Sequence, residues 1–204
     1  MSIVNTLSLE SNRKIKINFD GGDLSSDAGL LLIKEFVSKL GMDKLFSQSF
    51  NTNDSALFRY HTDKENLLQM IYMIIAGYFE DDSSDELTND PVFKAVLNKD
   101  TLASQPTISR FHNRMDEDSL NQFLSINQIL RKKVYSIQMP EAIILDLDST
   151  LLNAYGKQEG RAFNFHYQSN GYHPLVCYDG IKGDLIKIQL RDGTQYSSTG
   201  VVDF

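Results

Sequence analysis

The sequence contains a single cysteine, Cys177, in 204 residues, so no disulfide can form within the chain. Such scarcity is typical of a protein that folds in a reducing cytoplasm. Residues 1–19 lack an apolar core long enough for a signal peptide. The longest apolar run, residues 67–79, is too short to span a bilayer, and acidic residues follow it. We therefore expect a soluble, cytoplasmic protein with no membrane among its partners.

Positive charge is also scarce. The chain has 20 Lys and Arg against 27 Asp and Glu, which gives a formal net charge of −7. This balance counts against a simple nucleic-acid binder, which is usually basic, although a local basic face can still bind phosphates. Hydrophobic residues make up 41% of the chain, with twelve Phe and nine Tyr, which is enough for a packed core.

The first part of the chain is predicted to be mainly helical. A short strand is expected at 14–19, before a break at Gly21-Gly22. The segment 25–27 offers an N-cap for the next helix, and Gly41 should end that helix. The polar stretch 46–61 should be a loop. Apolar residues at helical spacing predict helices over residues 30–40, 64–79, 91–97, 106–115 and 119–135, the last of them ended by Pro140.

Beyond Pro140 the pattern changes to strands. The segments expected to be strands are 142–145, the most apolar, then 163–167, 174–178 and 185–190. Gly180, Gly183 and Asp184 stand where a hairpin turn should join the last two. We predict an α/β protein, in which residues 1–139 form a mainly helical N-terminal region and residues 140–204 begin a strand-rich domain.

Two carboxylates lie at the end of the first of these strands. Residues i and i+2 of a strand point to the same face, so Asp146 and Asp148 should be neighbours in space. Two neighbouring carboxylates repel each other unless a cation or a proton lies between them, and Mg²⁺ favours such oxygen ligands. A metal held there can activate water and neutralise a phosphoryl group.

Two other interpretations of the pair remain open. Asp-Ser-Thr after a strand is also a common turn or helix cap, so one Asp can be purely structural. The segment 145–150 resembles the Asp-x-Asp-x-Thr motif of haloacid-dehalogenase-like phosphatases, which implies Asp146 as nucleophile and Asp148 as general acid/base. Those enzymes need a lysine and a further acidic cluster downstream, whereas the residues after Thr150 are predicted to be strands and hairpins.

Several short blocks, in order along almost the whole chain, resemble the DDE transposases of bacterial insertion sequences, in particular the thirteen-eighty group. The blocks are FDGG at 19–22, LSSDAG at 24–29, GY at 77–78, DP at 90–91, LASQPT at 102–107, LDLDST at 145–150, GY at 171–172, PL at 174–175 and LR at 190–191. No block is decisive alone, but the ordered set is specific.

The resemblance implies a ribonuclease-H-like mixed sheet, of which residues 140–204 would be the first strands. It also implies metal-assisted cutting and joining of DNA, with Mg²⁺ or Mn²⁺ in the complete site. The family's first carboxylate falls on the Asp-x-Thr unit, which favours Asp148. Asp146 would be a second ligand or a structural neighbour. The DNA partner would be the terminal repeats of an insertion sequence, and a homodimer is an open alternative.

The family's second Asp and its Glu would lie beyond Phe204. Asp179, Asp184 and Asp192 stand in predicted turns, so none of them replaces the missing carboxylates. We therefore expect a catalytically incomplete transposase fragment: a truncated remnant, the first reading frame of a split gene, or a piece of a longer protein. A non-catalytic DNA-binding module is the alternative.

The helix predicted at 106–115 is the candidate for DNA contact. Thr107, Arg110, Asn113 and Arg114 should share one face, at spacings of three and four residues. Such a helix could enter a major groove, with its arginines on guanine or on phosphates. An ordinary amphipathic helix with a solvated polar face is the alternative interpretation.

Overall fold

The computed structural model describes residues 6–19 and 25–204, so the predicted break at Gly21-Gly22 and most of the FDGG block lie outside the described residues. The chain forms two compact units, one up to residue 126 and one from residue 127 to 204. No helix within the described ranges has both the length and the apolarity needed to cross a membrane.

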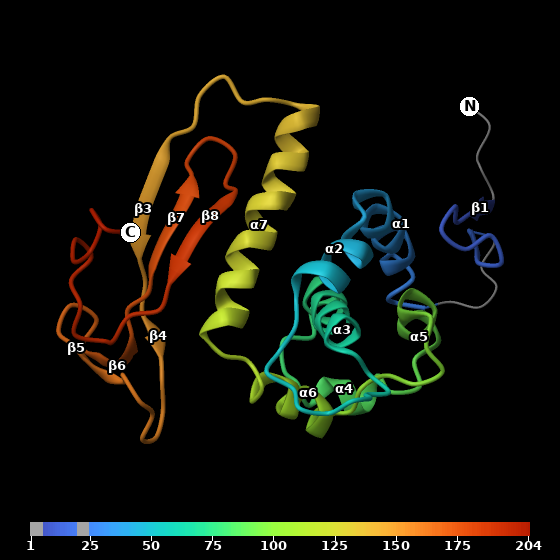
Figure 1. Cartoon of the computed structure of the whole chain (residues 1–204), viewed down its shortest axis with the longest axis horizontal. Helices are drawn as coiled ribbons and strands as arrows, with labels where there is room; N and C mark the ends of the chain where they lie inside the picture. Colours follow the sequence, from blue (N-terminus) through green and yellow to red (C-terminus); the bar gives the residue numbers. More distant parts are fainter. Residues whose placement is uncertain (1–5, 20–24) are drawn as a thin grey trace. The chain divides into compact units, whose positions relative to one another are not determined.

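The first unit is mainly helical (Figure 1). Its elements are β1 (Thr6–Ser8), β2 (Lys16–Asn18), α1 (Leu30–Leu40), α2 (Met42–Ser49), α3 (Asp63–Ala76), α4 (Ser83–Glu86), α5 (Pro91–Leu97) and α6 (Gln105–His112), followed by the start of α7 (Glu117–Ile137). β1 and β2 form an antiparallel pair. α3 contacts α1, α2, α5 and α6, so it is the central helix of the unit, as its apolar composition predicts.

A capping box fixes the start of α3. The Thr62 hydroxyl accepts a hydrogen bond from the Glu65 backbone N–H, and the Glu65 side chain accepts one from the Thr62 N–H. In the middle of the helix, the buried amide of Gln69 donates to the carbonyl of Ala103 and accepts from its N–H, both at 2.8 Å. These two bonds attach α3 to the segment that leads into α6.

The second unit holds the strands of the C-terminal part. β3 (Leu145–Ser149), β7 (Leu175–Asp179) and β8 (Leu185–Gln189) form one sheet in the order β3-β7-β8. β4 (Leu152–Asn153), β6 (Ser169–Tyr172) and β5 (Ala162–Asn164) form another, in the order β4-β6-β5. All strand pairs among the described residues are antiparallel. The C-terminal part of α7 is attached to β8, because Asn127 and Arg131 donate hydrogen bonds to the carbonyl of Leu185.

Glycine permits the close approach of β4 and β6. A Cβ at Gly171 would lie 2.1 Å from the backbone oxygen of Leu152, so no larger residue fits without moving β4. β7 is the best-buried strand, since Leu175, Val176 and Cys177 are all buried. β3 lies at an edge of its sheet, with one side paired to β7.

The α/β class is confirmed, and the helix at 91–97 has the predicted bounds. The helix at 30–40 is also confirmed, ending at Gly41 with a left-handed φ of 68°. Its predicted N-cap is wrong: residue 29 occupies the N-cap, and no side chain caps the helix. The predicted loop at 46–61 is wrong at its start, because α2 continues through Ser49. The predicted buried strand at 142–145 begins only at Leu145, and the residues before it are exposed.

Candidate functional site

Asp146 and Asp148 share one face of β3, as their spacing predicts. In the register with β7, Asp146 lies opposite Tyr178 and Asp148 opposite Val176. Both aspartates are exposed. Asp148 Oδ1 accepts a hydrogen bond from the backbone N–H of Ser149 at 2.7 Å, whereas no hydrogen bond or ion pair reaches the Asp146 carboxylate from the described residues. Oxygens of both side chains are therefore available to a cation from solvent.

The donor set suits a hard divalent cation but is small. Two carboxylates on one exposed strand face can hold Mg²⁺ or Mn²⁺ through one oxygen each, with water completing the shell. In the part of the chain that the structure describes, no group of three or more His, Cys, Asp or Glu side chains is placed to hold a metal ion. The aspartate pair therefore offers two carboxylates, and the described residues add no third His, Cys, Asp or Glu side chain to it.

Asp179 does not join this pair. It lies opposite Leu145 in the register and therefore on the other face of the sheet from Asp146. Its side chain is completely buried, and its Oδ1 accepts a hydrogen bond from the backbone N–H of Ile181 in the β7–β8 turn. Asp192 forms an isolated β-bridge with Tyr172 just before a turn, and its carboxylate accepts hydrogen bonds from Thr194 in that turn. The turn predicted for Asp179 begins one residue later, because Asp179 is the last residue of β7.

A pocket of about 200 Å³ in the second unit is lined by His173 and Ser197. The Ser197 hydroxyl lies 2.8 Å from the Ser149 hydroxyl at the end of β3. His173 is only 3% exposed, with Nδ1 2.6 Å from the carbonyl of Gln195 and Nε2 without a hydrogen-bond partner. No sequence signal marks His173, because it has no metal-ligand spacing to other histidines.

The four predicted DNA-contacting residues lie on α6 and just after it. Thr107 and Arg110 are on the helix, with Arg110 Nη2 3.4 Å from Thr107 Oγ1. Asn113 is the exposed C-cap residue. Arg114 is mostly buried. Its guanidinium lies 2.9 Å from Asp63 Oδ1 and also pairs with the carboxylate of Asp54. Thr107, Arg110 and Asn113 therefore remain accessible, whereas Arg114 is held within the protein.

Asp54 is the second carboxylate of this network. It accepts two hydrogen bonds at 2.8 Å from the Arg59 guanidinium and lies 3.4 Å from Arg114 Nε. The hydrogen bonds from Arg59, followed by one from the backbone N–H of Ala56, hold the pKa of the Asp54 carboxyl well below its usual range. The carboxylate is therefore charged across the physiological pH range.

The acidic run before α5 caps α6. The backbone N–H of Gln105, the first residue of α6, donates to Asp85 Oδ1 at 2.9 Å, and the Gln105 side chain donates to Asp81 Oδ2 at 3.1 Å. Negative charge at a helix N-terminus is stabilising, which gives this run a structural role. Ser104 is at the N-cap position, but its hydroxyl faces Thr107 Oγ1 and makes no cap hydrogen bond.

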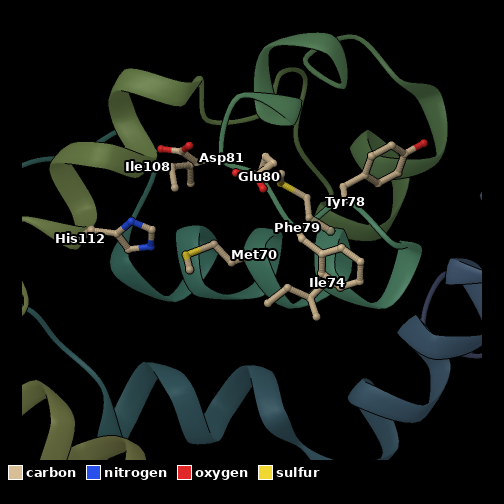
Figure 2. Close-up of a pocket in the computed structure, with 9 residues that line it drawn as sticks. Met70, Ile74, Tyr78, Phe79, Glu80, Asp81, Ile108 and His112 are labelled. Carbon is tan, nitrogen blue, oxygen red and sulfur yellow. The ribbon is translucent and has the colours of Figure 1, made fainter. Parts of the chain in front are cut away.

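A pocket of about 320 Å³ lies beside α3. Figure 2 shows residues that line it. Met70 and Ile74 of α3, Ile108 and His112 of α6, and Phe79 after α3 contribute to its lining. The apolar part of this lining is thioether, aliphatic or aromatic. The pocket thus combines apolar side chains with the polar groups of Tyr78, Glu80, Asp81 and His112, and we assign it no role.

Comparison with known families identifies a matching family model. A family model described as transposase DDE domain group 1 matches residues 7–204. No curated protein and no solved structure gave a match. The matched range extends over most of the first unit and all of the second, including the aspartate pair on β3 and the whole of α6.

Proposed function

Because this chain belongs to the family of transposase DDE domains of group 1, we propose that it serves metal-dependent cutting and joining of DNA at the ends of an insertion sequence. The observation that carries this proposal is the shared, exposed face of Asp146 and Asp148 on β3. When bound there, Mg²⁺ or Mn²⁺ would supply charge neutralisation at the phosphoryl group and an activated oxygen nucleophile. Within the family, we assign the chain to the thirteen-eighty group on its ordered sequence blocks.

Asp148 is our choice for the first catalytic carboxylate. It belongs to the Asp-x-Thr unit formed with Thr150, and its Oδ1 is oriented by the Ser149 N–H. Asp146, without a protein partner among the described residues, is the second ligand. The antiparallel order β3-β7-β8 is compatible with the first three strands of a ribonuclease-H-like sheet. A complete site needs at least one further carboxylate beyond those that the described residues gather.

We assign the DNA contact to the helical region of residues 1–139. Thr107, Arg110 and Asn113 are the accessible members of the predicted face of α6, and α6 is anchored by Asp85 at its N-terminus. The phosphatase interpretation is not favoured, since the family match extends over residues 7–204 and the strands after β3 form antiparallel pairs.

Manganese titration followed by NMR tests the metal site without requiring turnover. We expect Mn²⁺ to broaden the amide signals of β3 and of the facing part of β7 first, because paramagnetic broadening falls steeply with distance. The double variant Asp146→Asn/Asp148→Asn should lose this broadening, whereas Asp100→Asn, an exposed aspartate in the other unit, should keep it.

Broadening that is absent from β3, or that persists in the double variant, would rule out the aspartate pair as the metal site. DNA binding without any Mn²⁺ effect at β3 would favour the non-catalytic DNA-binding module. Hydrolysis of p-nitrophenyl phosphate that depends on Asp146 and needs no DNA would instead support the phosphatase.

A further inference from the structure

A small pocket on the first unit combines arginines with an unpartnered buried amide. It measures about 180 Å³ and lies between α6, α3 and the segment 59–61 that precedes α3. Arg59, Asn66, Thr107 and Arg110 contribute to its lining, and we call it the arginine pocket. Thr107 and Arg110 belong to the predicted DNA-contacting face, whereas the sequence predicted only that Asn66 lies in the helix at 64–79.

Two of the three arginines that line the pocket form ion pairs with carboxylates. Arg59 pairs with Asp54, and Arg114 pairs with both Asp54 and Asp63. Arg110 has no carboxylate within ion-pair distance among the described residues, and its side chain is exposed beside Thr107 Oγ1. The pocket therefore keeps one uncompensated positive charge at its mouth, which attracts an anion.

His61 also lines the pocket, as a neutral ring. Burial first, and then the positive charge of Lys99, lower the pKa of His61 below its ordinary value of 6.5. At neutral pH the ring is uncharged, so it neither adds to nor cancels the excess charge of Arg110.

Asn66 gives the second, independent indication of a ligand. Its side chain is 1% exposed, and neither Nδ2 nor Oδ1 has a hydrogen-bond partner. Buried side-chain amides in native proteins are almost always paired, because an unpaired one has lost its water without replacement. An apolar side chain of the same size would serve packing better at this position. A polar group that enters the pocket would satisfy the amide.

We propose that the arginine pocket binds a phosphate group of the DNA backbone. The guanidinium of Arg110 and the hydroxyl of Thr107 donate to phosphate oxygens at the mouth, and Asn66 Nδ2 donates from the floor. Asn66 Oδ1 accepts from a water molecule that accompanies the phosphate. This deepens the DNA contact proposed for α6: the helix holds the backbone and sets register there, rather than reading bases.

Binding of a fluorescein-labelled DNA duplex of mixed sequence, followed by fluorescence anisotropy at several salt concentrations, tests the pocket. Arg110→Gln should weaken binding about tenfold or more, as expected for loss of a charge-assisted contact. It should also reduce the slope of log K against log salt by about 0.9, the value for one released counterion. Arg13→Gln is the matched control, since Arg13 is exposed and outside the pocket lining.

Asn66→Leu separates a binding role from a structural one. It should weaken DNA binding and at the same time raise the melting temperature of the free protein, because two unpaired polar atoms are replaced by apolar ones. A purely structural Asn66 would leave DNA affinity unchanged. Wild-type affinity in both Arg110→Gln and Asn66→Leu, or an equal loss in Arg13→Gln, overturns the proposal.

Inorganic phosphate distinguishes the two sources of the ligand group. If it raises the melting temperature of the wild type but not of Arg110→Gln, and displaces DNA only at high concentration, the site takes a backbone phosphate. If it binds in this way and the wild type binds no DNA, a free phosphate is the ligand and the DNA proposal for α6 fails. If the wild type binds neither inorganic phosphate nor DNA, the pocket is not a phosphate site. The Mn²⁺ experiment at Asp146 and Asp148 is independent of this result.

Discussion

Replacing Arg114 by Gln should destabilise the first unit, although its sequence position suggests a DNA contact. The guanidinium lies 2.9 Å from Asp63 Oδ1 and 3.4 Å from Asp54 Oδ2, and it donates to Thr52 Oγ1 at 3.1 Å. Its side chain is 15% exposed. Breaking a fully buried ion pair costs about 3–5 kcal/mol, and breaking a surface pair costs about 0–1 kcal/mol.

The expected cost lies between these limits, because the two carboxylates keep other partners. Asp54 retains Arg59, and Asp63 retains the backbone N–H and hydroxyl of Thr52, both at 2.7 Å. We expect Arg114→Gln to lower the free energy of unfolding by about 2 kcal/mol. For a chain of this size, that corresponds to a fall in melting temperature of roughly 4–8 °C.

Urea denaturation followed by far-UV circular dichroism measures the loss, and hydrogen exchange of α3 and α6 amides locates it. Arg13→Gln, on the exposed surface, should stay within about 0.5 kcal/mol of the wild type. Arg114→Lys should recover part of the stability, since an ammonium can reach one carboxylate but cannot bridge both. A loss for Arg114→Gln no larger than that of Arg13→Gln would refute the network as a structural tie.

Three further substitutions are informative, two in the first unit and one in the second. The hydrogen bonds from Arg59 lower the pKa of Asp54 from 3.8, so its stabilisation is present above that pH and is lost as pH falls through the lowered pKa. The stability gap between wild type and Asp54→Asn, from urea melts at stepped pH, should therefore narrow below about pH 4. Gln69→Leu should cost about 2–4 kcal/mol in urea, because it leaves a buried backbone N–H and carbonyl unpaired. Gly171→Ala should cost at least about 1–3 kcal/mol and speed hydrogen exchange in the β4–β6 pair, because its Cβ would meet the carbonyl of Leu152.

Local sequence patterns predict those parts of the fold that local forces determine. Helix α5 has Pro91 in its first turn and Asp90 as its N-cap, and its bounds follow from those two residues. Helix α2 was missed because only Phe46 of its eight residues is buried, so its periodicity is weak. Strand β6 was missed because Gly171 and its polar neighbours lack strand propensity, and pairing on both sides holds them extended.

Features of the candidate sites that depend on local spacing were predictable, and features that depend on long-range contacts were not. Strand alternation places Asp146 and Asp148 on one face, and this much was predictable from their spacing. The ion pair between Arg114 and Asp63 was not predictable, because Asp63 is 51 residues earlier in the chain and meets Arg114 only after folding. The unpaired amide of Asn66 was also hidden, since a polar residue in a buried helix gives no sign in the sequence of whether it has a partner.

The net negative charge of the chain counts against nucleic-acid binding, but the carboxylates near α6 are engaged by groups of the protein itself. Asp54 and Asp63 are paired with Arg59 and Arg114, so these carboxylates neutralise cations of the same pocket rather than repelling an approaching phosphate. Asp81 and Asp85 are likewise engaged with Gln105, at the positive end of the α6 dipole. The charge that faces solvent beside Thr107 is that of Arg110. Because Coulomb forces are screened over about 8–10 Å at physiological salt, a phosphate at that position responds to this local charge more than to the net charge of −7.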